Sequence, residues 1–272
     1  MITLDDKYRL EDFGFIFEPG YDDALTPVFD RKTYTIPGRP GAIPFGTETK
    51  ERPFAYPLII MERFHMDMQD KFRNLISFFF DEYGEPRKIK MIRDYEPDKF
   101  YYIELAQQVI PERLSEDGKL VLQLVAFDPY SYSIVHSTEN VHWGDDIPFM
   151  SDIPFLLGDS KTLVTSPTSI EIENYGSLVV RPKVVIFGNA EGFSLKINGE
   201  KFYVGNFTQS TVTIDAETYT AIRVRGTAQS NILYSLEGNL EKLELFPGVN
   251  TIEVTGVNMN VTVDLQFRAK YK

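Results

Sequence analysis

Only one segment of this 272-residue chain has the apolar spacing of an amphipathic helix. Between residues 67 and 84, the apolar side chains that recur at helical intervals are Phe72, Leu75, Ile76, Phe79, Phe80 and Tyr83. Asp67 is a suitable N-cap, and Gly84 is a suitable stop. The apolar stripe is wide and aromatic, so we expect the helix to pack on a β-sheet rather than to bind a ligand. A chain with one such helix builds its core mostly from strands.

The composition favours the same mainly-β class. The chain has 21 Phe, 15 Tyr, 18 Gly and 16 Pro, which suits many short strands and turns. Its length accommodates two domains. With 28 basic and 40 acidic residues, the net charge is −12. Because nucleic acids and anionic membranes attract positive surfaces, we expect neither specific nucleic-acid binding nor membrane binding.

Residues 1–137 predict an α+β domain, in which the helix covers a sheet or split barrel. Phe13, Phe15 and Phe17 alternate with other residues, as in a strand with one aromatic face. A second strand is expected over residues 54–66, before the helix. The strands expected after the helix cover residues 87–93, 100–105 and 120–127, with a turn at Glu116-Asp117-Gly118.

A run of prolines and glycines interrupts this domain. The segment Pro37-Gly-Arg-Pro-Gly-Ala-Ile-Pro-Phe-Gly46 excludes a helix and makes a central strand improbable. Two interpretations stay open, namely a projecting hairpin arm and a rigid surface loop within one subunit. A buried Phe45 would favour the loop.

Residues 167–272 predict an antiparallel β-sandwich. The strand candidates cover residues 169–173, 183–187, 193–197, 202–204, 211–214, 221–224, 232–236, 243–245, 251–254 and 261–267. No helical segment separates them, and short strands at this spacing are typical of a sandwich. Asn198-Gly199 is the strongest hairpin signal in the chain.

A linker is predicted between the two domains, over residues 138–166, where the periodicity is low. Around it, His136 and His142 lie near Glu139, Asp145 and Asp146. The spacing of the two histidines matches no known ligand motif, so we predict exposed side chains and no metal.

The sequence contains no recognisable catalytic constellation. Cysteine is absent, which excludes thiol nucleophiles, disulfides and zinc–thiolate sites. The segment around Gly158 lacks the upstream glycine of a phosphate loop, and neighbouring acidic residues are expected by chance in so acidic a chain. We therefore predict no catalytic residues, no cofactor and no enzymatic activity. The first residues have no signal-peptide core, which indicates synthesis in a cytoplasm.

Two further segments carry a resemblance to a known family. One is Phe127-Asp-Pro-Tyr-Ser-Tyr-Ser133, which closes the first domain. The other is Leu245-Phe-Pro-Gly-Val-Asn-Thr-Ile-Glu-Val-Thr-Gly256, followed by a strand that ends in Phe267-Arg-Ala-Lys-Tyr271. Together with the proline-glycine run, the single helix and the Asn198-Gly199 hairpin, they occur in the order of a distal tail protein. Over essentially its whole length, the chain resembles the distal tail family of long non-contractile-tailed phages and prophages.

The resemblance implies a virion structural protein of the phage tail tip, made in the cytoplasm of a bacterial host. Proteins of this family form a hexameric ring through the N-terminal domain, around the channel through which DNA leaves. The C-terminal domain is a galectin-like or carbohydrate-module-like sandwich. The implied partners are the tail tube protein, a tail-associated lysin or hub protein, and a receptor-binding protein.

The resemblance also points to contacts between subunits. The proline-glycine run is the candidate arm that embraces a neighbour, and its candidate residues are Pro37, Gly38, Arg39, Gly41 and Phe45. The rings of Tyr130 and Tyr132 suit a joint between domains or subunits, where their hydroxyl groups find partners.

Two other function classes remain as alternatives. An aromatic-rich sandwich also suits a carbohydrate-binding module for attachment to the host surface, although the chain has a single Trp. A hydrolase would need two carboxylates about 5–9 Å apart in a cleft, which nothing in the sequence indicates.

Overall fold

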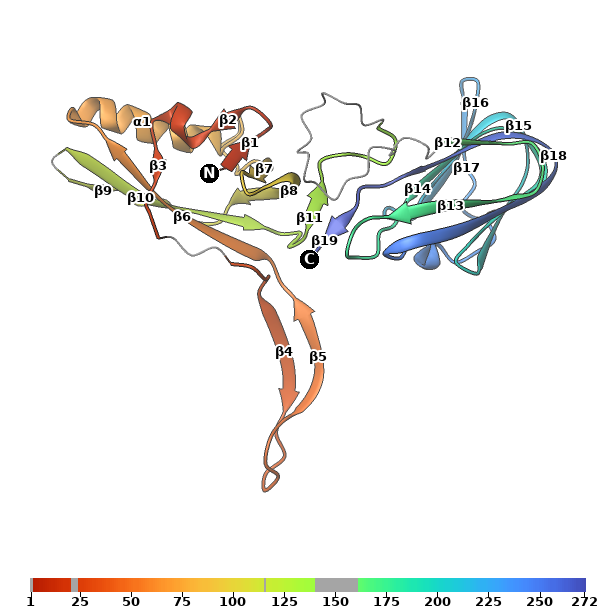
Figure 1. Cartoon of the computed structure of the whole chain (residues 1–272), viewed down its shortest axis with the longest axis horizontal. Coiled ribbons are helices and arrows are strands. Elements are labelled where there is room, and N and C mark those ends of the chain that lie inside the picture. The colour runs from red at the N-terminus through yellow and green to blue at the C-terminus, as the bar shows by residue number, and fades with distance from the viewer. Residues whose placement is uncertain (1, 21–23, 115, 140–160) are drawn as a thin grey trace. The chain divides into compact units, whose positions relative to one another are not determined.

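The computed structural model describes residues 2–20, 24–114, 116–139 and 161–272. The chain divides into two compact units, Met1–Ser131 and Tyr132–Lys272. Each unit has its own buried apolar core, and each is built mainly from antiparallel strands (Figure 1). The predicted mainly-β fold class is confirmed.

The first unit has one α-helix, α1 (His65–Phe78), and a short 3₁₀ helix, η1 (Leu10–Phe13), among its described residues. Its strands are β1 (Ile2–Leu4), β2 (Tyr8–Arg9), β3 (Ile16–Phe17), β4 (Phe29–Tyr34), β5 (Ile43–Thr49), β6 (Arg52–Met61), β7 (Ile89–Arg93), β8 (Glu96–Leu105), β9 (Glu112–Arg113) and β10 (Asp117–Ala126). The main sheet has the order β2-β1-β7-β8-β10-β6-β3, and β9 pairs with β10. Strands β4 and β5 form a separate two-stranded sheet.

Alternation along β6 and β10 places the core on one side of this sheet. Successive side chains of a strand point to opposite faces, so every second residue is buried. The buried residues of these two strands are Phe54, Tyr56, Leu58, Ile60, Leu120, Leu122 and Leu124. The helix α1 packs on that side through Met68, Phe72 and Leu75, as the aromatic stripe predicted.

The helix ends earlier than the sequence pattern indicated. It begins at His65, so that Asp67 lies within the first turn and is not the N-cap. It stops at Phe78, because the following residues form a turn in which Asp81 Oδ1 accepts hydrogen bonds from the backbone N–H groups of Tyr83 and Glu85. The predicted boundaries of 67 and 84 are therefore wrong. The predicted face is right for the buried Phe72, Leu75 and Phe79 and wrong for Tyr83, which lies beyond the helix and is 90% exposed.

The aromatic alternation near the N-terminus is also only partly strand. Phe13 ends the 3₁₀ helix η1, and Gly14 follows it in the left-handed region with φ of 84°. Phe15 is fully buried, and Phe13 and Phe17 pack against the same core. The prediction placed the three rings on the correct side, but Gly14 interrupts the strand between them.

The described strands of the second unit are longer than predicted. After β11 (Ser131–Ser133), they are β12 (Lys161–Val164), β13 (Thr168–Asn174), β14 (Lys183–Ile197), β15 (Glu200–Asp215), β16 (Thr220–Arg225), β17 (Ala228–Asn231), β18 (Gly248–Gln266) and β19 (Lys270–Tyr271), with the 3₁₀ helix η2 (Leu240–Lys242). Their sheet has the order β12-β18-β14-β15-β16-β17, and β13 also pairs with β18. Strands β14, β15 and β18 each join two segments that we predicted as separate strands.

Bulges explain how such long strands enclose a core. The pairing of β14 with both neighbours shifts register between Gly188 and Ser194. A bulge bends a strand and increases its twist. Side chains on both halves of β14, such as Ile186 and Leu195, consequently reach one core. The arrangement is a sandwich-like curled sheet, in agreement with the predicted class.

The sequence pattern predicted the hairpin at Asn198-Gly199 correctly, but the strand that it predicted over residues 232–236 is wrong. Asn198 and Gly199 have φ values of 48° and 94° and connect β14 to β15 as the predicted tight hairpin. Residues 232–236, by contrast, form a turn and not a strand. The backbone N–H of Leu233 donates to the side chain of Asn231 at 2.9 Å, which closes an Asx turn. Residues 243–245 contribute only an isolated bridge, between Leu245 and Val180.

The segment between the predicted domains is described in part. Residues 132–137 belong to the second unit, where the Ser137 hydroxyl donates to the Leu265 carbonyl oxygen at 2.9 Å. Of the linker predicted over 138–166, residues 140–160 lie outside the described residues, and β12 follows them. His142, Asp145 and Asp146 are among those outside the description.

Candidate functional site

A two-stranded arm in the first unit is almost wholly exposed. Strands β4 and β5 pair from Phe29 opposite Thr49 to Tyr34 opposite Ile43. Apart from Ile43, every residue of both strands is exposed. The arm, residues 29–49, extends from the sheet on the side away from α1 (Figure 1). It corresponds to the projecting hairpin that the proline-glycine run allowed.

The arm brings together five of the seven candidate interface residues. Pro37, Gly38, Arg39 and Gly41 lie in the exposed tip that connects the two strands. Gly38 and Gly41 have φ values of 83° and 87°, which only glycine adopts at little cost. Phe45 is 72% exposed. A buried Phe45 would have favoured the rigid surface loop within one subunit, so this exposure removes that support for the loop.

The two tyrosines lie elsewhere. Tyr130 is half-buried near the end of the first unit, and Tyr132 is half-buried at the start of the second. The Lys270 ammonium lies 5.1 Å from the centroid of the Tyr132 ring, within the second unit. Neither tyrosine is part of the arm.

The base of the arm is fixed by a buried arginine that the sequence analysis missed. Arg52 begins β6 and is only 2% exposed. Its Nε and NH2 groups donate to the Ala24 carbonyl oxygen at 3.2 and 2.8 Å, and NH1 donates to the Tyr101 hydroxyl at 2.8 Å. The guanidinium group thus joins the chain entering the arm to the strand leaving it. The register of β6 could have revealed it, because Arg52 stands in phase with the buried Phe54 and Tyr56.

The charge of the arm is opposite to that of the whole chain. Residues 31–46 contain Arg31, Lys32 and Arg39 and no acidic residue. Lys32 forms an ion pair with Glu48, and Lys50 forms one with Asp30 at 3.7 Å, both near the base. Arg31 and Arg39 are exposed. The distal arm is therefore cationic. It is also aromatic, because the rings of Tyr34 and Phe45 meet edge to face, with their centroids 6.4 Å apart.

The described residues contain no candidate metal-binding site. Within residues 2–20, 24–114, 116–139 and 161–272, no group of three His, Asp or Glu side chains could hold an ion. His136 is half-buried, with its Nδ1 atom 2.9 Å from the Thr138 hydroxyl. In the described part of the chain, no helix is long and apolar enough to cross a membrane.

Comparison with known proteins identifies the first unit. Residues 7–126 match the family model described as phage tail protein RIFT-related domain. These residues make up most of the first unit, which is therefore similar to a phage tail RIFT-related domain. The arm, residues 29–49, lies within the matched residues.

The whole chain has the fold of a distal tail protein. The crystal structure of the Dit protein of phage SPP1 superposes with a TM-score of 0.66 at 15% identity, over 98% of this chain and 98% of that one. The resemblance predicted from the sequence is confirmed. Two structures of the phage P2 baseplate in its activated conformation also align, with TM-scores of 0.39 and 0.40 at 9% and 10% identity. They cover 95% and 98% of this chain and 92% and 97% of theirs. No curated protein matches the chain by sequence.

Proposed function

We propose that this chain is a structural protein of a phage tail tip whose copies assemble into a ring of six through their phage tail domains. The observation that carries the proposal is the exposed arm of that domain. Tyr34 and Phe45 present aromatic surface to water, at 58% and 72% exposure. Packing such surface against a neighbour removes it from water, which stabilises an assembly.

In the proposed assembly, the ring joins the tail tube protein to a tail-associated lysin or hub protein and encloses the DNA exit channel. A receptor-binding protein attaches at the periphery. The structure of SPP1 Dit is described as a paradigm of the hub adsorption apparatus in phages that infect Gram-positive bacteria. This chain shares that fold over almost its full length, which supports a virion component made in a bacterial host. The role is structural rather than enzymatic.

The net charge of −12 supports a channel through which DNA passes without binding. Phosphate groups are repelled by an acidic wall, so the genome does not adhere to it. Half-buried Tyr130 and Tyr132 are proposed to stabilise a joint between domains or subunits.

The assembly is tested with a variant of the arm and a matched control. Replacing both Tyr34 and Phe45 by Ser removes the exposed rings of the arm, and we expect association to weaken about 10–100-fold, since aromatic anchors dominate interfaces. The control Tyr83→Ser removes a ring outside the arm that is still more exposed, at 90%, and is expected to leave association unchanged. Sedimentation velocity over a range of concentrations measures both. Identical oligomers for the arm variant and the wild type would contradict the proposed role of the arm.

A carbohydrate-binding second unit is the other candidate function. It is favoured by Tyr234, which is 99% exposed on that unit and offers a free ring face on which a sugar could stack. A glycan array probed with the full-length chain tests it. The candidate requires binding that is lost in Tyr234→Ala, and an array without signal above background removes it.

A further inference from the structure

The sheet of the first unit has an apolar face that α1 does not cover. The residues of β3, β6 and β10 that point away from the helix include Ile16, Ala55, Pro57, Ile59 and Val121. We call these five residues the outward face. Ile16 and Val121 are 44% and 45% exposed. Ile16 lies opposite Ile59 across β3 and β6, and Pro57 lies opposite Val121 across β6 and β10, so the apolar side chains adjoin.

Prolines on β6 direct a partner onto this face and away from the strand edge. The backbone N–H of Glu18 donates to the Pro57 carbonyl oxygen at 2.9 Å, which shows that Pro57 presents its backbone groups on the side of β3. Pro53 has the same phase in the strand. The β3 segment already covers Pro57, and Pro53 has no N–H to offer to an added strand, so edge pairing at Pro53 is disfavoured. A partner gains more by packing on the side chains.

Acidic groups surround the Lys119 ammonium at this face. Lys119 Nζ lies 2.6 Å from Glu18 Oε1, in the cross-strand row of Ile16 and Ile59. Glu112 pairs opposite Lys119 across β9 and β10. The hydrogen bond to Glu18 raises the pKa of Lys119, and the charges of Glu112 and Asp117 act in the same direction. Three carboxylates around one ammonium make the border of the outward face acidic.

The distal arm is complementary to the outward face in apolar surface and in charge. Its exposed cations are Arg31 and Arg39, since Lys32 pairs with Glu48, and it exposes the rings of Tyr34 and Phe45. Within one copy the two surfaces do not cover each other, because both remain exposed. Two different complementary surfaces on one chain produce head-to-tail contacts, which form a ring when the rotation between successive copies closes.

We propose that the arm of one copy packs on the outward face of a second copy. The inference rests on the proposed ring and names the place on the neighbour where the arm binds. The rings of Tyr34 and Phe45 cover Ile16, Pro57 and Val121, and the arginines of the arm approach the acidic border. A head-to-tail repeat of this contact uses each arm and each outward face once.

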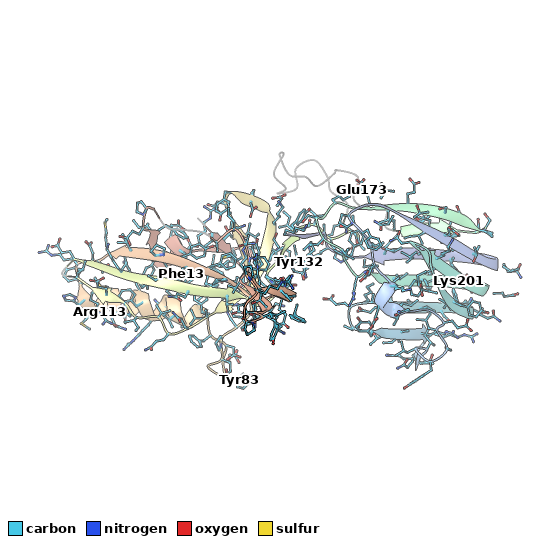
Figure 2. The ribbon with its side chains drawn as sticks, turned by 90° about the horizontal axis from the view of Figure 1, so that it is seen from below. Phe13, Tyr83, Arg113, Tyr132, Glu173 and Lys201 are labelled. Atoms are coloured by element: carbon cyan, nitrogen blue, oxygen red, sulfur yellow. The ribbon has the colours of Figure 1, made fainter. Side chains whose placement is uncertain are left out.

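The absence of cysteine from the chain makes the contact directly testable. Phe45→Cys and Val121→Cys variants are purified separately, mixed, and oxidised under mild conditions. We expect a disulfide-linked dimer in the mixture at a yield at least several-fold above that of either variant alone. Ile16→Cys is the second position on the outward face, and it is expected to replace Val121→Cys if that variant folds poorly. The control is Tyr83→Cys, because Tyr83 is 90% exposed and lies on the turn after α1, outside the arm and the outward face (Figure 2).

The results separate this inference from the proposed ring. If light scattering shows an oligomer but Phe45→Cys links to Tyr83→Cys as well as to the outward face, or to neither, the docking place is wrong and the ring stands. If Phe45→Cys links mainly to itself, the arms meet each other and the inference is overturned. A chain that stays monomeric and forms no link in any mixture contradicts both proposals.

Discussion

Gly118 leaves room for side chains of α1 to pack closely on the sheet. A Cβ atom at this position would lie 2.8 Å from the Phe72 ring and 2.9 Å from the Ile60 side chain, both of which are buried. The sequence analysis took Gly118 for part of a turn, but it lies within β10 opposite Ile60. The residue is small because the core requires close approach, and not because the backbone turns.

We therefore expect Gly118→Ala to destabilise the first unit by about 1–3 kcal/mol, the usual cost of overpacking a filled core. Urea unfolding measures the change. Gln123→Ala, on the same strand but outside the core, is the control and is expected to change stability by less than about 0.5 kcal/mol. Equal stability of Gly118→Ala and the wild type would show that the helix packs less closely than described.

His136 makes stability depend on pH in the second unit. Burial lowers the pKa of the His136 imidazole below its ordinary value of 6.5, the Arg268 charge lowers it further, and the charges of Glu139 and Asp264 oppose the shift. The folded state thus binds the proton less readily than the unfolded state. At a pH above the pKa that His136 has in the unfolded chain, the histidine costs no stability. As the pH falls through that pKa, the unfolded chain takes up the proton more readily, and the folded state loses stability.

We expect the loss of melting temperature between pH 7.5 and pH 5 to be smaller in His136→Gln than in the wild type. Calorimetry at several pH values compares the two proteins. Parallel pH profiles would mean that His136 titrates alike in the folded and unfolded states.

At the scale of elements, the arm depends on contacts that are distant in sequence. The proline-glycine run predicted the hairpin, because turn preferences are local. Arg52 was missed, because its partners Ala24 and Tyr101 are 28 and 49 residues away. Local patterns describe what the arm is, whereas long-range hydrogen bonds determine how its base is held.

We expect Arg52→Met to destabilise the first unit by about 2–4 kcal/mol, because several hydrogen bonds from a buried charge are lost. Amide hydrogen exchange is expected to rise most around residues 24–30 and 48–52, at the base of the arm. Arg181→Met is the control, since Arg181 is partly exposed and its ion pair with Glu244 spans 3.4 Å. Uniform acceleration over the whole first unit would contradict a specific role in holding the arm.

The strands show the same division between local and distant causes. Asn198-Gly199 was predicted correctly, since both residues favour positive φ. The continuity of β14 through Gly188 was not, because a bulge and a turn have similar sequence signals. Gly188 has φ of 138°, and a Cβ there would lie 2.0 Å from the Asn260 carbonyl oxygen. The neighbouring strands β15 and β18, which pair with Gly188 through Ser210 and Val261, show that this glycine lies within a sheet.

At the scale of the whole molecule, fold class and family could be predicted, whereas the exposed surfaces could not. The order of the helix, the arm and the Asn198-Gly199 hairpin is a sequence property, and it led to the distal tail resemblance. The outward face was missed because Ile16, Pro57 and Val121 read as ordinary strand residues. Apolar residues on the two sides of a sheet look alike until one side is covered.

The central claim is that six copies of this chain form a ring, and the most direct test is the mass and shape of the purified full-length protein. Light scattering coupled to size-exclusion chromatography is combined with negative-stain images of the same fractions. We predict a mass six times the 31.3 kDa of the chain and six-fold particles with a central hole. A monomer at every accessible concentration, or a dimer with two-fold symmetry and no hole, would contradict the account.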